Sequence, residues 1–152
     1  MIIFTAIFLI NAFYSFNSYK ELASKFTTWN SYKKISDTVY NDSKSDFGYF
    51  INTLDQYSSY PIMYAMVYSD KNYHVQSYSL IKKPVIYIIV GPNPDGTHFD
   101  NNWFRKNRVR INKKPDKIFD FERGFVAEKY FLTEKEQQAP IDPNIFQSLH
   151  FR

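Results

Sequence analysis

The segment from Asn17 to Tyr40 has the spacing of an amphipathic helix. It contains no Pro or Gly, and its apolar residues recur at steps of three or four, at Tyr19, Leu22, Phe26, Trp29, Tyr32, Ile35 and Val39. That spacing matches one face of a helix. The run Phe16–Ala23 is echoed as Trp29–Ser36, which favours two short helices, each capped by Asn or Ser, with a break near residues 27–30. A chance repetition of common residues explains the echo equally well.

Beyond the polar loop Asn41–Asp46, the pattern changes to short apolar runs bounded by turn residues, which is typical of β-strands. The predicted strands are Phe47–Leu54, Pro61–Tyr68, Tyr73–Leu80, Pro84–Val90, Arg108–Asn112, Lys117–Phe121 and Phe125–Leu132. The turn Ser69–Asn72 would join the second and third strands into a hairpin. Val85–Val90 is an unbroken apolar run, which predicts a central strand buried on both faces.

Three further patterns complete the predicted domain. Arg108–Asn112 alternates polar and apolar residues, so we expect Val109 and Ile111 to face the core. Thr133–Gln138 predicts a short helical turn, because Pro140 and Pro143 cannot continue it. The apolar residues of the tail Asn144–Arg152 predict that it docks on the domain.

The order of these elements predicts an α+β fold, with an N-terminal helix or helix pair packed on an antiparallel sheet of about five to seven strands. Strands and helices do not alternate in the predicted order, which argues against a nucleotide-binding parallel sheet.

Composition narrows the class of protein. The chain has 152 residues, of which 20% are aromatic and none is Cys. The missing thiol excludes disulfide scaffolds, zinc ribbons and Cys nucleophiles, and the aromatic content excludes a disordered chain. We therefore expect one compact domain that packing alone holds together, and no cofactor.

The first residues predict a targeting segment. Met1–Ser18 contains no Asp, Glu, Lys or Arg, and it is apolar over most of Ile2–Phe16. This suits the apolar region of a secretory signal peptide, although a basic leader and a clear cleavage site are missing. We favour an export signal over an uncleaved membrane anchor formed by residues 1–16, and both over a buried core helix. Residues 19–152 would then form a single α+β domain in the periplasm or the cell envelope, the alternative being the cytoplasm.

Charge is concentrated in one segment. The chain carries a net +4, but residues 105–117 alone hold seven cations and one anion. The predicted partner-binding residues are these cations together with a neighbouring aromatic residue, namely Arg105, Lys106, Arg108, Arg110, Lys113, Lys114, Lys117 and Trp103. Such a patch attracts anionic partners. The competing interpretation is a solvated hairpin whose charges protect an exposed sheet edge.

One loop offers candidate chemistry. After the predicted central strand, Asp95, His98 and Asp100 could provide three metal ligands, or His98 could act as a general base oriented by Asp100. Against this, Asn-Pro-Asp-Gly is ordinary turn chemistry, and no second His stands at ligand spacing. His74 and His150 are interpreted as structural or surface residues.

Three hypotheses follow. We favour a small exported binding protein without catalytic activity, whose basic β-ribbon docks an unknown protein or an anionic envelope component, for example to neutralise a toxin. The first alternative is a small hydrolase or metal-dependent enzyme that uses His98 with Asp95 or Asp100. The second is a nucleic-acid-binding module with aromatic residues beside the cations, which the export signal and the missing RNP motif disfavour.

Overall fold

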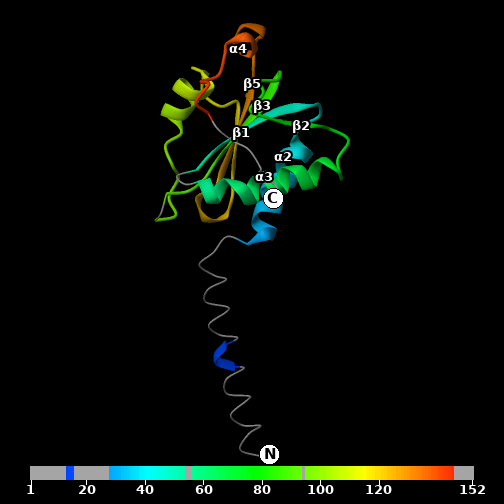
Figure 1. Ribbon diagram of the computed structural model, residues 1–152, viewed down its shortest axis with the longest axis vertical. Coiled ribbons are helices and arrows are strands. Elements are labelled where there is room, and N and C mark those ends of the chain that lie inside the picture. Colours follow the sequence, from blue (N-terminus) through cyan, green and yellow to red (C-terminus); the bar gives the residue numbers. More distant parts are fainter. Residues whose placement is uncertain (1–12, 16–27, 54–55, 94, 146–152) are drawn as a thin grey trace, which may run out of the picture.

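The structure is a computed structural model that describes residues 13–15, 28–53, 56–93 and 95–145. These residues form an α+β fold around one five-stranded sheet (Figure 1). The strands are β1 (Phe47–Asn52), β2 (Ser77–Ser79), β3 (Val85–Val90), β4 (Lys117–Asp120) and β5 (Val126–Phe131). The helical segments are α2 (Trp29–Asp42), α3 (Gln56–Asp70), η1 (Phe104–Val109), η2 (Glu122–Gly124) and α4 (Glu134–Gln138).

The sheet is mixed, whereas the sequence predicted an antiparallel one. Its strand order is β2-β1-β3-β5-β4. β1 pairs in parallel with both β2 and β3, while β5 pairs antiparallel with both β3 and β4. The strand number agrees with the prediction, but β1, β2 and β3 pair in parallel, which the prediction of an antiparallel sheet did not include.

β3 is the central strand, as the sequence predicted. It lies between β1 and β5, and its residues from Ile86 to Val90 are all buried. Tyr87 and Ile89 face the layer that contains α2 and α3. Ile86, Ile88 and Val90 face the opposite layer. An unbroken apolar run is what a strand covered on both faces requires.

The prediction of a strand at Pro61–Tyr68 is wrong, because these residues lie within α3. Tyr and Val favour strands, yet the buried residues of this segment follow a helical period. Ile62, Met66 and Ser69 are buried at steps of three and four, which is the spacing of one helical face. Tertiary packing of that face therefore outweighs the local preference for a strand.

The predicted hairpin of residues 61–80 is replaced by a parallel β1–α3–β2 unit. From β2 the chain must then cross β1 to reach β3, and it does so through Leu80–Pro84. The backbone of Ile81 passes directly over Gly48, so closely that a Cβ there would lie 1.8 Å from the carbonyl oxygen of Ile81. Leu80 enters this crossing in the left-handed conformation, with φ 57°.

α2 and α3 cover one face of the sheet, so the predicted helical layer exists, although it contains α3 as well. Ile35 and Val39 of α2 join Ile62 and Met66 of α3 in the core on that face. The ring of Tyr40 packs edge-on against that of β1 residue Phe47, with 5.0 Å between the ring centres.

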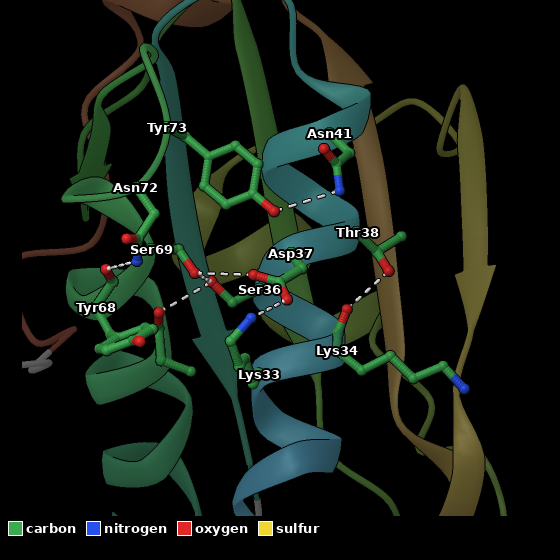
Figure 2. A network of polar contacts seen from close by, with 11 residues as sticks. Lys33, Lys34, Ser36, Asp37, Thr38, Asn41, Tyr68, Ser69, Asn72 and Tyr73 are labelled. Carbon is green, nitrogen blue, oxygen red and sulfur yellow. Dashed lines mark hydrogen bonds and ion pairs between the residues drawn. The ribbon is translucent and has the colours of Figure 1, made fainter.

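Polar contacts join the two helices (Figure 2). The Ser36 hydroxyl donates to the Ala65 carbonyl at 3.0 Å and to the Ser69 hydroxyl at 2.8 Å. Both serines are fully buried, so these hydrogen bonds satisfy groups that water cannot reach. Beside them, Lys33 pairs with Asp37 one turn further along α2.

The second predicted helix begins where the break was expected. α2 starts at Trp29 and has Thr28 at its N-cap, although the expected caps were Asn or Ser. The first predicted helix falls largely on residues 16–27, which lie outside the described residues. Most of the predicted targeting segment at residues 1–18 also lies outside the described residues. Only Phe13–Ser15 of it are described, and they are helical. The helices in the described part of the chain are all too short or too polar to cross a lipid bilayer.

The C-terminal half largely follows the sequence. β4 and β5 lie within the predicted strands, and α4 forms where a short helical turn was expected. Thr133 caps α4 by accepting from the Glu136 amide, while the Glu136 side chain accepts from the Thr133 amide, which is a capping box. The predicted docking of the tail falls mainly on residues 146–152, outside the described part of the chain.

Candidate binding surface

The basic segment contains a helix where a strand was predicted. Phe104–Val109 form a six-residue π-helical turn, η1, preceded by Trp103 and ended by Arg110 in the left-handed conformation (φ 60°, ψ 55°). The left-handed conformation is unfavourable for a residue with a side chain. π-helical turns are rare and often mark functional sites. The predicted basic β-ribbon is therefore, over residues 104–110, a strained helical turn.

The prediction that Val109 and Ile111 face the core is confirmed, although the predicted strand is absent. Val109 and Ile111 are both fully buried. They pack with Phe50, Ile88 and Tyr130 on the sheet face opposite to α2 and α3. The left-handed Arg110 lets the chain turn so that the residues on either side of it both point inward, which an alternating strand would also have achieved.

A polar network ties the start of η1 to the sheet. Asn101 accepts from the Asn52 amide at 2.8 Å and donates to the Glu128 carboxylate at 2.7 Å. Tyr130 donates to the same carboxylate at 2.5 Å. Burial of Tyr130, and then its hydrogen bond to Glu128, raise the pKa of the Tyr130 hydroxyl above its ordinary value. The hydroxyl therefore remains a donor at physiological pH.

Arg105 lies inside this arrangement, although it was predicted to bind a partner. Only 7% of Arg105 is exposed. One guanidinium nitrogen donates to the Asn102 side chain at 2.6 Å, while its Nε atom is buried without a hydrogen-bond partner in the described part of the chain. Arg105 is thus buried between η1 and the sheet, and it does not contribute to the exposed surface.

Three more of the predicted cations are engaged within the molecule. Arg108 pairs with Asp142 at 2.5 Å, Lys113 with Asp116 at 3.2 Å, and Lys117 with Asp42 at 2.6 Å. The remaining three, Lys106, Arg110 and Lys114, are exposed. None of these three forms an ion pair with a described residue. The charge available to a partner is thus smaller than residues 105–117 suggested.

Trp103 stands out among the exposed side chains. It is 61% exposed, and the Arg108 guanidinium lies over its ring, 5.3 Å from the ring centre. Within the same segment, Lys106 and Arg110 add unpaired cations. We call Trp103, Lys106, Arg108 and Arg110 the η1 surface. In Figure 1, η1 is the yellow-green helical segment at the upper left, remote from α2 and α3.

The loop with the candidate chemistry follows β3, as predicted, but its three side chains have separate partners. Asp95 accepts from the Thr97 amide and hydroxyl, and Asp100 accepts from the Asn102 amide. His98 faces Asp120 across 3.7 Å, with both side chains exposed. No hydrogen bond or ion pair between described residues joins His98 to Asp95 or Asp100.

The other histidines add nothing to this loop. His74 is exposed, and His150 lies outside the described residues. Across the residues that the structure describes, no three His, Asp or Glu side chains gather closely enough to hold a metal ion.

Sequence reasoning missed the network of Asn52, Asn101 and Glu128. A signal was present for Glu128, because the alternation of Val126, Glu128 and Tyr130 along one strand places the carboxylate on the same face as two buried side chains. Asn52 and Asn101 are far apart in the sequence, and they meet only because the fold brings the end of β1 beside the loop that follows β3.

Comparisons with known proteins yield no relative. No protein-family model, no curated protein and no solved structure matches the chain.

Proposed function

We propose that the protein is an exported binding protein of the cell envelope that docks an acidic partner protein through the η1 surface. The observation that carries the proposal is the exposed Trp103, stacked with Arg108 on a strained π-helical turn. Trp and Arg are the residues that most often dominate binding energy at protein interfaces. Strained backbone tends to be kept where it serves a function.

The unpaired cations suggest the charge of the partner. Lys106 and Arg110 follow Trp103 in the same segment and lack ion pairs with described residues, so an acidic surface would provide the missing counter-charges. Charge complementarity of this kind speeds association and selects the partner. Blocking the active site of a toxin is one concrete version of such docking.

Affinity capture with variants tests this proposal. The immobilised full chain is compared with the triple variant Trp103→Ala/Lys106→Ala/Arg110→Ala. A matched control, Ile118→Ala/Lys44→Ala/Lys135→Ala, removes one exposed apolar side chain and two exposed lysines elsewhere. We expect one acidic protein to be retained by the wild type and the control and lost from the triple variant. Equal retention by all three proteins would refute the role of the η1 surface.

The export part of the proposal has its own test. It rests on the uncharged, apolar segment Met1–Ser18. A fusion of Met1–Ser24 to a reporter that is active only outside the cytoplasm should give reporter activity, and replacing Phe8 and Leu9 with Asp in the fusion should abolish it. Reporter that stays in the cytoplasm with the unaltered segment would refute export while leaving the binding surface untouched.

A further inference from the structure

The segment that follows α4 is attached to η1 through its main chain, a side chain and the core. The backbone amide of Asp142 donates to the Arg108 carbonyl at 2.9 Å, and the Asp142 carboxylate pairs with the Arg108 guanidinium. One residue earlier, Ile141 packs against the core cluster that contains Val109 and Ile111. The position of Asp142 relative to η1 is therefore fixed by several independent contacts.

Asp142 is also held in place by the residues that follow it. Both the amide and the side-chain nitrogen of Asn144 donate to Oδ1 of Asp142, at 2.8 and 3.0 Å, while Oδ2 faces Arg108. The hydrogen bond from the Asn144 amide, and then that from Arg108, lower the pKa of Asp142 against the opposing effect of desolvation. Asp142 is therefore a charged and fixed partner for Arg108 at physiological pH.

The π-helical turn brings Arg108 over the ring of Trp103, which lies five residues earlier. In an α-helix, two residues five apart point about 140° away from each other and do not share a face. In a π-helix the backbone hydrogen bonds join residues i and i+5, so Arg108 lies one turn after Trp103. The strained turn is thus what makes the contact between Trp103 and Arg108 possible.

Asp142 uses only part of the Arg108 guanidinium. Nη1 donates to Asp142, and no other hydrogen bond joins this guanidinium to a residue in the described part of the chain. The Arg108 side chain is 31% exposed. A guanidinium presents its N–H donors in a planar fork that matches the two oxygens of a carboxylate. Arg108 thus has donors left for a carboxylate of another molecule.

We propose that Arg108 binds a carboxylate side chain of the partner protein, and that Asp142 is its positioning residue, which holds the guanidinium over Trp103 before the partner arrives. This inference rests on the proposed function, because it names the group that the partner presents to the η1 surface. Binding then does not have to order a long side chain, a cost that weakens association. Asp142 therefore strengthens the binding of an acidic partner, although its own charge repels such a partner.

The positioning role is measured first in the free, full-length protein by NMR. Nuclear Overhauser effects between the Trp103 ring and the Arg108 side chain report whether the guanidinium stays over the ring. We expect Asp142→Asn to weaken these effects several-fold. The control Asp116→Asn breaks the ion pair with Lys113, elsewhere in the basic segment, and should leave them unchanged. Undiminished effects in Asp142→Asn would overturn the proposal.

Binding of a carboxylate is measured with a hexaglutamate peptide, followed through the Trp103 indole signal. Asp142→Asn and Asp116→Asn each add one unit of positive charge, so simple attraction would make both variants bind the peptide more tightly than the wild type. We expect Asp142→Asn to bind it about three- to tenfold more weakly instead, which is the cost of ordering one long side chain. Asp116→Asn should bind at least as tightly as the wild type.

The variant Arg108→Lys separates charge from geometry, because it keeps the positive charge and loses the planar fork. It should also bind the peptide several-fold more weakly, and it tests the same site if Asp142→Asn does not fold. Wild-type affinity in Arg108→Lys or tighter binding by Asp142→Asn would overturn the proposal. A wild-type Trp103 signal that the peptide does not move would overturn it as well.

These outcomes are separable from a failure of the proposed function. The affinity capture compares variants of Trp103, Lys106 and Arg110, so it can retain an acidic protein even when the peptide experiments fail. Only the roles of Arg108 and Asp142 would then be refuted. Conversely, capture that retains no acidic protein would refute the proposed function, while the expected NMR and peptide results would still support the carboxylate site.

Discussion

Asp42, at the end of α2, joins that helix to three strands through one carboxylate. It accepts hydrogen bonds from Lys117 of β4 at 2.6 Å, Lys129 of β5 at 2.6 Å and Tyr87 of β3 at 2.8 Å. Partial burial alone would raise the pKa of Asp42, but the hydrogen bonds from Lys117, Lys129 and Tyr87 outweigh it and lower the pKa to about 2. The ionised form is therefore the one that the fold stabilises.

This low pKa predicts how stability changes with pH. A carboxylate whose pKa is lower in the folded state stabilises the protein above its unfolded pKa, near 3.8, and loses that contribution as pH falls through its folded pKa, about 2. We expect the contribution to be about 1–2 kcal/mol at neutral pH, after allowing for partial solvent screening. Urea unfolding at a series of pH values measures it.

The variant Asp42→Asn isolates the effect. At pH 7 the free energy of unfolding of this variant should be about 2–4 kcal/mol lower than that of the wild type. The substitution removes the ionised carboxylate and also leaves the buried Lys129 without a counter-charge. The difference from wild type should shrink between pH 4 and pH 2 as the wild-type carboxylate becomes protonated. Glu122→Gln, which removes an exposed ion pair with Lys34, is the control, with an effect below about 1 kcal/mol. A pH-independent difference for Asp42→Asn would contradict the assignment.

At the residue scale, the sequence predicted burial better than it predicted the role of charge. Val109, Ile111 and the residues of β3 are buried as their apolar character required. The same reasoning placed all seven cations of residues 105–117 on a surface, yet Arg105 is buried. Charge alone cannot reveal burial, because the contacts that shelter Arg105 come from the packing of η1 on the sheet.

At the scale of elements, Gly48 permits the crossing that makes the sheet mixed. The Leu80–Pro84 connection must pass over β1, and the Ile81 carbonyl lies where a Cβ of residue 48 would be. We expect Gly48→Ala to lower the free energy of unfolding by more than about 3 kcal/mol, since two backbones would have to separate. Denaturant unfolding measures this change.

Gly91→Ala is the matched control for Gly48→Ala. Its added Cβ would meet mainly a methyl group of Thr53, at 2.9 Å. A side chain can move more cheaply than a backbone carbonyl, so the loss should be smaller than for Gly48→Ala. Similar losses for the two variants would contradict the account of the crossing.

The left-handed Arg110 allows stability and binding to be separated. A Gly relieves the strain of a positive φ, so Arg110→Gly should keep or raise the free energy of unfolding, by up to about 1 kcal/mol. It should nevertheless weaken binding of the acidic partner, because it removes an unpaired cation from the η1 surface. Thermal unfolding and titration calorimetry measure the two effects.

Arg123 provides the control for this substitution, because it is a second left-handed arginine, with φ 61°, and lies outside η1. Arg123→Gly should change stability in the same direction and leave partner affinity intact. If Arg123→Gly weakens binding as much as Arg110→Gly does, the binding surface has been placed on the wrong element.

Elements with a clear hydrophobic period or a clear helix cap were predictable from the sequence. Elements whose structure depends on contacts between residues far apart in the sequence were not. β3, β4, β5 and α4 form within or near their predicted ranges. The prediction of a strand at Pro61–Tyr68 rests on its Tyr, Met and Val content, which hides the helical spacing of its buried residues. The sequence predicts a strand at Arg108–Asn112, because Val109 and Ile111 point inward both in a strand and in the π-helical η1 with the turn that follows it.

On the scale of the whole molecule, the two layers around the sheet differ in character. One layer, formed by α2 and α3, exposes Trp29, Val67 and Tyr68, and the other exposes the η1 surface with its unpaired cations. The fold class was predictable as α+β, but this division into two surfaces was not, because it depends on the parallel crossing from β1 to β2.

The charge on the η1 surface predicts how salt affects binding of the acidic partner. Raising the ionic strength should lower the association rate constant several-fold and change the dissociation rate constant little, because screening acts mainly on long-range attraction. Surface plasmon resonance at two salt concentrations measures both constants. An association rate constant that does not respond to salt would show that the cations do not steer the partner.

Photo-crosslinking from position 103, in cells that produce the protein, tests directly whether the η1 surface contacts a partner. A photoreactive phenylalanine analogue replaces Trp103 in one variant and the exposed Ile81, outside the η1 surface, in another. We expect a crosslink to one acidic protein from position 103 and none to that protein from position 81. Crosslinks to the same protein from both positions, or from position 81 alone, would contradict it.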